Sequence, residues 1–249
     1  MKINEIIEEI KKKEELKNLE ESFIKERIND YLKKHSIDLE SLDIRSSSYK
    51  DLFKTVRKKC FNVYGLFKQK SKDTLQEHIS SKERLEFYPR IYRDIFTITG
   101  KPKTILDLGC GLNPLSYKYL ECKPTYYASE LSKGDCKTIE AFFKENKIKG
   151  ECFAFDLLKD DYSKLPKADI CFLFKVLESL EAVKKNISKE ILQKLNTKWI
   201  IVSFSKKSIT GKPIKKKGRS WLMRMLKELN YEYQILDIGE EIFYIINKD

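Results

Sequence analysis

Residues 1–99 carry apolar side chains at helical spacing. At the start of the chain, apolar positions recur at intervals of three and four residues: Ile3, Ile6, Ile7 and Ile10. These intervals put the side chains on one face of a helix. Two further helices are predicted to follow Asn18 and the serine run at 46–48, because those side chains can cap a helix N-terminus. The pattern therefore predicts a helical N-terminal domain.

A fourth helix is predicted to start at Lys82, behind a cap provided by Ser80 or Ser81, and to end near Gly100. Pro89 lies within this stretch. Because proline has no amide hydrogen to donate in a helix interior, it either kinks this helix or starts a new segment.

After Gly100 the pattern changes to short apolar runs that alternate with amphipathic stretches. The apolar runs predict strands at 104–108, 125–130, 151–156, 168–174 and 199–204. The stretches between them predict helices near 114–121, 133–147 and 184–196. Such alternation is typical of an α/β protein with a doubly wound parallel sheet.

The end of the chain departs from this alternation. A helix predicted near 219–229 is followed by two β-rich runs, at 233–238 and 242–246, with three residues between them. Two strands joined by so short a turn must pair antiparallel. Residues 100–249 are therefore predicted to form a mostly parallel seven-stranded sheet with an antiparallel C-terminal hairpin.

Composition narrows the class of protein. The chain has 249 residues, of which 41% are hydrophobic, enough for one large domain with a helical annex. No apolar run approaches the ~20 residues of a membrane span, and the N-terminus lacks the apolar centre of a signal peptide. Six scattered cysteines and two histidines argue against structural zinc and against a disulfide framework. We expect a cytoplasmic monomer without a metal or a membrane contact.

A glycine turn follows the first predicted strand. The strand ends at Leu108 and leads into Gly109-Cys110-Gly111, where the backbone can approach a ligand closely. Proline occupies position 114, where the dinucleotide fingerprint has its third glycine, which argues against NAD. The run Asp-Leu-Gly-Cys-Gly instead resembles motif I of S-adenosylmethionine (SAM) methyltransferases.

Acidic side chains end the next two predicted strands. In open α/β sheets a ligand binds outside the C-terminal strand ends. Glu130 can accept hydrogen bonds from ribose hydroxyls there, and Asp156 from the exocyclic amine of adenine, with Leu157 over the ring. A single loop carboxylate is more often just solvated. Two at consecutive strand ends after a glycine turn favour a ligand site.

Two more positions belong to the same predicted edge. The fourth strand ends at Phe174 and Lys175, which would place an apolar wall and a cation near the methyl-transfer position. Arg84 lies one turn inside the fourth predicted helix, where a guanidinium can clamp the carboxylate of the cofactor's methionine part. A capping pattern with a surface arginine explains the same spacing equally well.

Longer motifs occur in a fixed order along the chain. They are His78-x-Ser80-Ser81-x-Glu83-Arg84, Asp107-x-Gly-Cys-Gly-x-Asn-Pro-Leu115, Phe172-Leu-Phe-Lys175 and Val202-Ser-Phe204-x-x-Lys207-Ser208-x-x-Gly211-Lys212. The closing Ile238-Gly-x-Glu-Ile-Phe-Tyr-Ile245 follows. Together they resemble the 16S rRNA (guanine-N7) methyltransferases that confer aminoglycoside resistance. The resemblance runs from about residue 78 to residue 246.

The resemblance implies a fold, a cofactor and a substrate. The fold would be the Rossmann-like fold of SAM methyltransferases, with a helical N-terminal domain over 1–99 that binds RNA and covers the cofactor. The substrate would be a guanine N7 of 16S rRNA in the decoding site of the 30S ribosomal subunit. The cofactor contacts would be His78, Ile79, Ser80, Arg84, Gly109, Glu130, Asp156, Leu157 and Phe174, to which the turn adds Gly111.

Four positions depart from the family pattern. Glu130 stands where the family has aspartate, and Val183 where it has glutamine. Glu178 and Ser205 each replace a proline. Because most of these changes lie on the fourth and fifth strands, near the target base, they bear more on the target nucleotide than on the cofactor.

A basic loop is predicted after the fifth strand. The stretch 206–219 holds seven basic residues and no acidic one: Lys206, Lys207, Lys212, Lys215, Lys216, Lys217 and Arg219. The whole chain carries a net charge of +12, which favours a polyanionic partner. Lysine and arginine contacts to phosphates provide position and affinity. A solvated charge run is the alternative, but the place of the loop beside the predicted cofactor favours RNA binding.

The predicted chemistry needs no general base, because guanine N7 already carries a lone pair. Catalysis would come from positioning, with the nucleophile ~3–3.5 Å from the methyl group. Lys175 and Lys207 are candidates for orienting a flipped base. A non-catalytic RNA- or ribosome-binding protein on a methyltransferase scaffold is the main alternative. Methylation of a small molecule or a protein is a third hypothesis, but it would not explain the basic loop.

Overall fold

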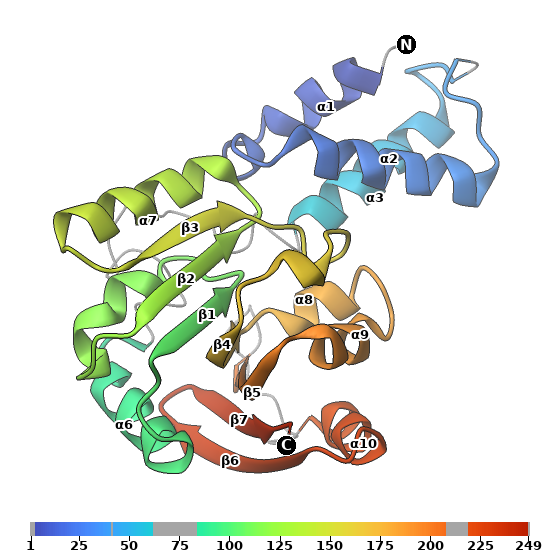
Figure 1. Ribbon diagram of the computed structural model, residues 1–249. Helices are drawn as coiled ribbons and strands as arrows, with labels where there is room; N and C mark the ends of the chain where they lie inside the picture. The colour runs from blue at the N-terminus through green and yellow to red at the C-terminus, as the bar shows by residue number, and fades with distance from the viewer. Residues whose placement is uncertain (1–2, 41, 62–83, 208–218, 249) are drawn as a thin grey trace.

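The protein forms a bundle of helices followed by a seven-stranded sheet (Figure 1). The structure is a computed structural model and describes residues 3–40, 42–61, 84–207 and 219–248. The order of helices and strands matches the predicted change from helical to alternating structure after Gly100.

Over the described residues up to 61, the bundle consists of three helices and a short 3-10 turn. They are α1 (Ile3–Lys11), the turn η1 (Glu14–Leu16), α2 (Glu21–His35) and α3 (Ser47–Cys60). The apolar positions predicted from the helical spacing meet in one cluster, in which Ile6, Ile10 and Ile24 are fully buried. The Ser46 hydroxyl accepts a hydrogen bond from the Tyr49 amide at 3.1 Å, so the predicted cap of α3 is confirmed. The prediction of Asn18 as a cap is wrong, because α2 starts after Glu20.

Helix α6 (Tyr88–Thr99) connects the N-terminal part to the sheet. Pro89 lies in its first turn, so this proline starts a helix and does not kink one. Gly100 follows the last helical residue with a φ of +79°, as the predicted end of the helix requires. The predicted start at Lys82 and its caps Ser80 and Ser81 lie outside the described residues.

Seven strands form one sheet in the order β3-β2-β1-β4-β5-β7-β6. Their bounds are β1 (Thr104–Leu108), β2 (Thr125–Glu130), β3 (Gly150–Ala154), β4 (Ala168–Phe174), β5 (Thr197–Ser205), β6 (Glu232–Ile238) and β7 (Glu241–Asn247). Strands β1 to β5 run parallel, and β7 pairs antiparallel with both β5 and β6. The predicted parallel sheet with an antiparallel closing hairpin is confirmed.

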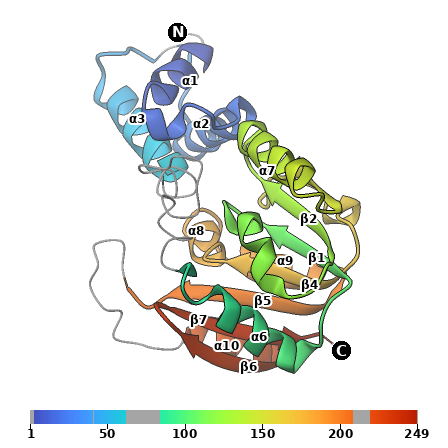
Figure 2. The ribbon, with the colours of Figure 1, turned by 90° about the vertical axis from the view of Figure 1, so that its left-hand side faces the viewer.

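Helices cover both faces of the sheet (Figures 1 and 2). On one face, α6, the 3-10 helix η3 (Asn113–Leu120) and α7 (Lys133–Glu145) pack against the strands. On the other face lie α8 (Leu177–Glu181), α9 (Ile187–Lys194) and α10 (Ser220–Glu228), with the short 3-10 turn η4 (Tyr162–Lys164). Two predictions differ in detail. The segment near 114–121 is a 3-10 helix. The helix predicted near 184–196 is present as α9, which is shorter, and α8 before it was not predicted.

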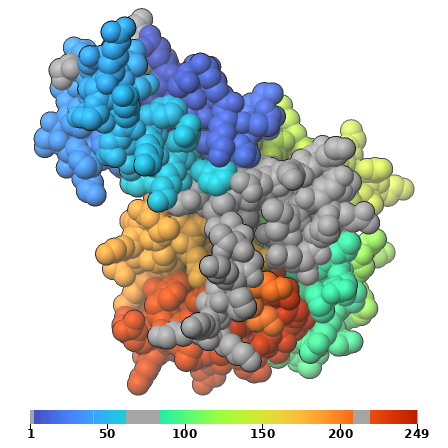
Figure 3. Space-filling model, turned by 180° about the vertical axis from the view of Figure 1, so that it is seen from behind, coloured from blue at the N-terminus to red at the C-terminus, as the bar shows by residue number. Residues whose placement is uncertain are grey.

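The helical bundle packs against the sheet where β2 and β3 end. Leu131 and Leu158, which follow these strands, pack against the apolar core of the bundle. The Lys133 amide donates a hydrogen bond to Glu20 at 3.4 Å. Seen from behind, the bundle lies at one end of the molecule and the red C-terminal hairpin with α10 at the other (Figure 3).

All six cysteines are free thiols, and five of them are buried. Within the described ranges, no group of three or more His, Cys, Asp or Glu side chains is placed to hold a metal ion. Nor does any helix in the described part of the chain have the length and apolar character needed to cross a membrane.

Candidate cofactor site at the C-terminal edge of the sheet

The glycine turn after β1 provides a close approach to the backbone. Gly109 and Gly111 have φ angles of +64° and +53°, in the left-handed region that favours glycine. A Cβ added at Gly109 would lie 2.9 Å from a methyl carbon of Val176. The turn is tied to β2 because the Cys110 amide donates to the Ser129 carbonyl at 3.0 Å. A side chain at Gly109 would therefore be strained by its backbone conformation and would collide with Val176.

Glu130 lies directly beside this turn. One carboxylate oxygen accepts a hydrogen bond from the Gly111 amide at 2.5 Å, and the other accepts from the Leu131 amide at 3.0 Å. These bonds fix the carboxylate at the C-terminal end of β2. A carboxylate oxygen can accept more than one hydrogen bond, so Glu130 is compatible with the predicted contact to ribose hydroxyls.

Asp156 and Leu157 lie just beyond β3, on the neighbouring strand end. The Phe155 amide donates to the Glu130 carbonyl at 2.9 Å, which keeps this loop against the end of β2. Leu157 is buried and would lie 3.9 Å from a Cβ at Gly109. The Asp156 carboxylate accepts a hydrogen bond from the Leu158 amide at 2.9 Å. Burial raises the pKa of Asp156, which is the expected effect of a partly enclosed site.

Arg84 is part of the same edge. Only 4% of it is exposed, so the alternative of a surface arginine is wrong. Its Nε donates to Glu241 at 2.7 Å, and Nη1 donates to the Asn113 side-chain oxygen at 2.9 Å. The guanidinium also lies 5.1 Å from the centre of the Phe174 ring. Because Asn113 follows the glycine turn, Arg84 is held next to the predicted cofactor position.

Asp107 is a site residue that the predicted cofactor contacts do not include. It is fully buried at the end of β1, and one oxygen accepts hydrogen bonds from Asn113 Nδ2 at 2.8 Å and the Tyr126 hydroxyl at 2.6 Å. The other oxygen, Oδ1, has no hydrogen-bond partner among the described residues. Burial raises the pKa of Asp107 to about 6, although Tyr126 and Asn113 oppose this shift. A buried acceptor without a partner fits a ligand that brings a donor, as the ammonium group of the methionine part of SAM does.

Lys175 and Lys207 are held by neighbouring glutamates. The Lys175 ammonium lies 3.1 Å from the Glu241 carboxylate, and its backbone adopts a φ of +59°, which is uncommon for a residue with a side chain. Lys207 is exposed and pairs with Glu240 at 3.0 Å. Lys206 pairs with Asp237 at 2.6 Å. These pairs place Lys206 and Lys207 at the end of β5, next to the turn between β6 and β7. Lys175 follows the neighbouring strand β4.

Arg219, the last residue of the predicted basic stretch, is largely buried. It is 8% exposed, its Nε donates to Glu178 at 2.6 Å, and its Nη2 donates to the Ser205 carbonyl at 3.1 Å. An arginine engaged in this way ties α10 to α8 and β5, and its predicted contact with RNA stays a prediction. Two positions that depart from the family pattern, Glu178 and Ser205, are thus partners of one arginine.

Several predicted site residues lie outside the described residues. They are His78, Ile79, Ser80, Lys212, Lys215, Lys216 and Lys217. The described cofactor candidates come together around the glycine turn through the contacts given above. The acidic residues and the glycines can be recognised in the sequence because they follow predicted strands. The roles of Asn113 and Glu241 cannot be recognised in this way, because nothing local in the sequence marks them as partners of Arg84.

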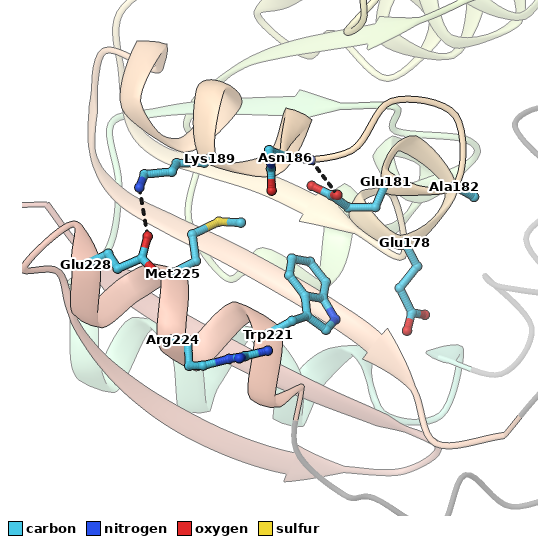
Figure 4. Close-up of a pocket in the computed structure, with 9 residues that line it drawn as sticks. All are labelled: Glu178, Glu181, Ala182, Asn186, Lys189, Trp221, Arg224, Met225 and Glu228. Carbon is cyan, nitrogen blue, oxygen red and sulfur yellow. Dashed lines mark hydrogen bonds and ion pairs between the residues drawn. The ribbon is translucent and has the colours of Figure 1, made fainter.

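A separate hollow of about 790 Å³ lies between α8, α9 and α10 (Figure 4). It is lined by Glu178, Glu181, Ala182, Asn186, Lys189, Trp221, Arg224, Met225 and Glu228. Two contacts brace its walls: Lys189 pairs with Glu228 at 2.8 Å, and Glu181 accepts from the Asn186 amide at 2.9 Å. None of the described lining residues is a cofactor candidate, so this hollow is distinct from the site at the glycine turn.

Comparison with known proteins supports the same interpretation. A protein from Serratia marcescens named 16S rRNA (guanine(1405)-N(7))-methyltransferase is 32% identical over 186 residues, which cover 72% of this chain and 70% of the relative. A protein of the same name from Micromonospora echinospora is 29% identical over 175 residues, covering 69% of this chain. The match spans only 63% of that relative's length.

Solved structures match over a greater length. The 16S rRNA methylase RmtB superposes with a TM-score of 0.75 at 22% identity, covering 100% of this chain and 99% of that one. RmtF in complex with S-adenosyl-L-homocysteine superposes with a TM-score of 0.77 at 19% identity, covering 99% of this chain and 98% of that one. These likenesses confirm the predicted fold, including the helical N-terminal part.

The family model described as "Ribosomal RNA methyltransferase (FmrO)" matches residues 64–228 of the chain. This range includes the glycine turn, both acidic strand ends and Arg84. Because the match covers more than half of the 249 residues, the protein belongs to the FmrO family of ribosomal RNA methyltransferases.

Proposed function

We propose that this protein is a SAM-dependent methyltransferase that methylates N7 of a guanine in the 16S rRNA of the 30S subunit. The observation that carries the proposal is the gathering of Arg84, Asp107 and Glu130 around one glycine turn, in a chain of the rRNA methyltransferase family. The relatives that match this chain carry the same guanine-N7 specificity in their names.

Different residues of the chain bind different parts of the cofactor. Arg84 binds the carboxylate of the methionine part, and the unpartnered oxygen of Asp107 accepts a hydrogen bond from its ammonium group. Glu130 accepts from the ribose, and Asp156 and Leu157 border the adenine. When bound, SAM supplies an electrophilic methyl group on a positively charged sulfur.

Catalysis then depends on position alone, and we assign no general base. Guanine N7 has a lone pair, so the protein removes no proton before transfer. Phe174 closes the apolar side of the site, and Lys175 orients the target nucleotide from the end of β4. Holding the nucleophile and the methyl group in line provides most of the rate enhancement in such a reaction.

The RNA is held by positive charge near the same edge. Lys206 and Lys207 lie at the end of β5, and the predicted basic residues Lys212, Lys215, Lys216 and Lys217 continue along the chain. The N-terminal domain predicted over residues 1–99 adds to the RNA contact and covers the adenine end of the site, which we infer from the docking of its helical bundle beside β2 and β3. We further propose that the protein acts as a monomer in the cytoplasm.

Two measurements test this proposal in sequence. Calorimetry tests SAM binding by the purified protein. Transfer of radiolabelled methyl groups is then measured on 30S subunits, on 50S subunits and on protein-free 16S rRNA. We expect transfer to 30S subunits, and borohydride–aniline cleavage with primer extension then identifies the modified guanine. SAM binding without transfer to any of these RNAs would favour the alternative hypothesis, a non-catalytic RNA- or ribosome-binding protein.

A third outcome would change the substrate class. Labelling of a guanine outside 16S rRNA would keep the N7 chemistry and discard the proposed substrate. Labelling at a position that resists borohydride–aniline cleavage would discard N7 as the acceptor atom.

A further inference from the structure

Glu241 is a buried carboxylate that no role described above requires. It is the first residue of β7, and only 1% of it is exposed. One oxygen accepts from Arg84 Nε at 2.7 Å and lies 3.1 Å from the Lys175 ammonium. The other accepts from the Ser203 hydroxyl at 2.7 Å. Burial opposes the charged form, but Arg84 and Lys175 outweigh it and hold the pKa of Glu241 below its usual range.

The two cations reach Glu241 from different directions. Arg84 precedes α6, and its far nitrogen binds Asn113 beside the glycine turn. Lys175 directly follows β4, and its amide donates to the Ser203 carbonyl at 3.0 Å. Ser203 therefore fixes the backbone of Lys175 with its carbonyl and the carboxylate of Glu241 with its hydroxyl. The arrangement holds Lys175 in a left-handed conformation that residues with a side chain seldom adopt.

Stability alone does not account for a charge at this position. Strand β7 is already held by its pairing with β5 and by buried apolar residues such as Phe243 and Ile245. Buried ion pairs are seldom more stabilising than apolar side chains of similar volume, because both charges lose their hydration. Convergence of buried charged groups beside a candidate cofactor site is instead typical of functional sites.

We propose that Glu241 is a positioning residue whose one carboxylate holds Arg84 at the cofactor and Lys175 at the target nucleotide. This inference rests on the proposed function for the roles of the two cations. It assigns to the closing hairpin a direct part in the site, across a sequence separation of 157 residues from Arg84. Removal of the charge would release both cations at once.

The central test is Glu241→Gln, which keeps the shape of the side chain and an acceptor for Ser203 but removes the charge. Calorimetry on the folded variant measures its SAM Kd, and methyl transfer to 30S subunits at saturating SAM measures kcat. We expect the Kd to rise about tenfold or more, the typical effect of removing a hydrogen bond to a charged group. We also expect kcat to fall, because Lys175 is no longer anchored.

Two control variants separate positioning from general damage. Ser203→Ala keeps the charge of Glu241 and its pairing with Arg84 and removes one hydrogen bond to the carboxylate, so its SAM Kd should rise less than that of Glu241→Gln. Glu228→Gln removes an exposed carboxylate that pairs with Lys189 and should leave both Kd and kcat unchanged. A melting temperature lowered by Glu241→Gln, with wild-type Kd and kcat in the folded protein, would show that Glu241 only holds β7 in place.

A double variant tests whether Glu241 acts through Lys175. Lys175→Met should lower kcat for 30S subunits at saturating SAM. In that background, adding Glu241→Gln should reduce kcat no further, because the group that Glu241 positions is already gone. Fully additive effects would overturn this half of the proposal.

If Glu241→Gln does not fold, Glu241→Asp takes its place in the test. This variant keeps the charge and shortens the side chain by one carbon. We then expect a SAM Kd between those of wild type and Arg84→Ala, and a wild-type Kd would overturn the proposal. Should wild-type protein bind SAM and methylate no RNA, the proposed function fails, while the SAM Kd of these variants still tests the hold of Glu241 on Arg84.

Discussion

Arg84 is a buried cation at the edge of the candidate cofactor site. The structure buries its guanidinium between Glu241, Asn113 and the ring of Phe174. Burying a cation is costly unless it is paired and hydrogen-bonded, and Glu241 and Asn113 provide those partners for Arg84.

We expect Arg84→Ala to weaken SAM binding at least about tenfold, because it removes a charge-assisted hydrogen bond to the cofactor's carboxylate. Calorimetry on the folded protein measures the change. Arg90→Ala is the matched control, since Arg90 is an exposed arginine on α6 that pairs with Asp94 at 3.4 Å. Equal SAM affinities in the two variants would remove Arg84 from the site.

We expect Asp107 to make SAM binding depend on pH. Its raised pKa of about 6 means that the carboxyl is largely protonated below that pH in the free protein. A cationic ammonium group binds the ionised form, so binding must release the proton at low pH. SAM affinity should therefore rise as pH increases from 5 to 7, by up to about tenfold per pH unit below the pKa, and then level off.

Calorimetry between pH 5 and pH 7 checks this dependence, and Asp107→Asn should flatten it because the amide does not titrate in this range. If the wild-type affinity is constant over the range, Asp107 is either ionised throughout or not in contact with the cofactor.

At the scale of elements, the turn between β1 and η3 shows what the sequence predicts well. Strand, glycines and proline are local signals, and β1 begins and ends where the apolar run does. The pairing of Arg219 with Glu178 and Ser205 was not predictable, because it joins three elements through side chains that look like independent surface residues in the sequence. The same holds for Arg84 and Glu241, whose contact depends on how the closing hairpin meets β5.

Substitution of Gly109 in this turn should lower both the stability of the protein and its affinity for SAM. Gly109→Ala forces a side chain into the left-handed conformation, which costs about 1–2 kcal/mol, and brings its Cβ to 2.9 Å from Val176. We expect a melting temperature lower by about 2–8 °C and weaker SAM binding. Scanning calorimetry and SAM titration measure the two effects.

Val176→Ala in the same chain separates these causes. It removes the methyl group that the new Cβ meets, so the double variant should recover part of the stability that Gly109→Ala removes. Recovery of stability without recovery of SAM affinity is expected if the turn also contacts the cofactor. Full recovery of both would mean that only the contact with Val176 mattered.

At the scale of the whole molecule, the sheet and the helical bundle could be predicted in outline and their contact could not. The alternation of strands with helices and the short final turn determine the fold class. The docking of the bundle depends on Leu131 and Leu158, two loop residues without a periodic pattern around them. Part of the candidate site at 78–80 and most of the basic loop lie outside the described residues, so their roles stay predictions.

The molecule carries a net charge of +12, which attracts any polyanion. We expect only the charges near the active site to position the RNA for methyl transfer. Changing Lys207, Lys212 and Lys216 together to Glu should abolish methyl transfer to 30S subunits and leave the SAM Kd unchanged. The matched control changes Lys137, Lys144 and Lys147 to Glu, which lie exposed on and after α7, beside β2 and β3.

Both triple variants alter the net charge by the same amount, so a general electrostatic effect would weaken them equally. We expect the α7 variant to keep most of its activity, because its charges lie far from β5 in the sheet order. The salt dependence of 30S binding provides a second measure, because the slope of log K against log salt concentration scales with the number of phosphates that the protein neutralises. Equal reductions of activity in the two variants, with equal changes in that slope, would show that the basic loop has no special part in RNA binding.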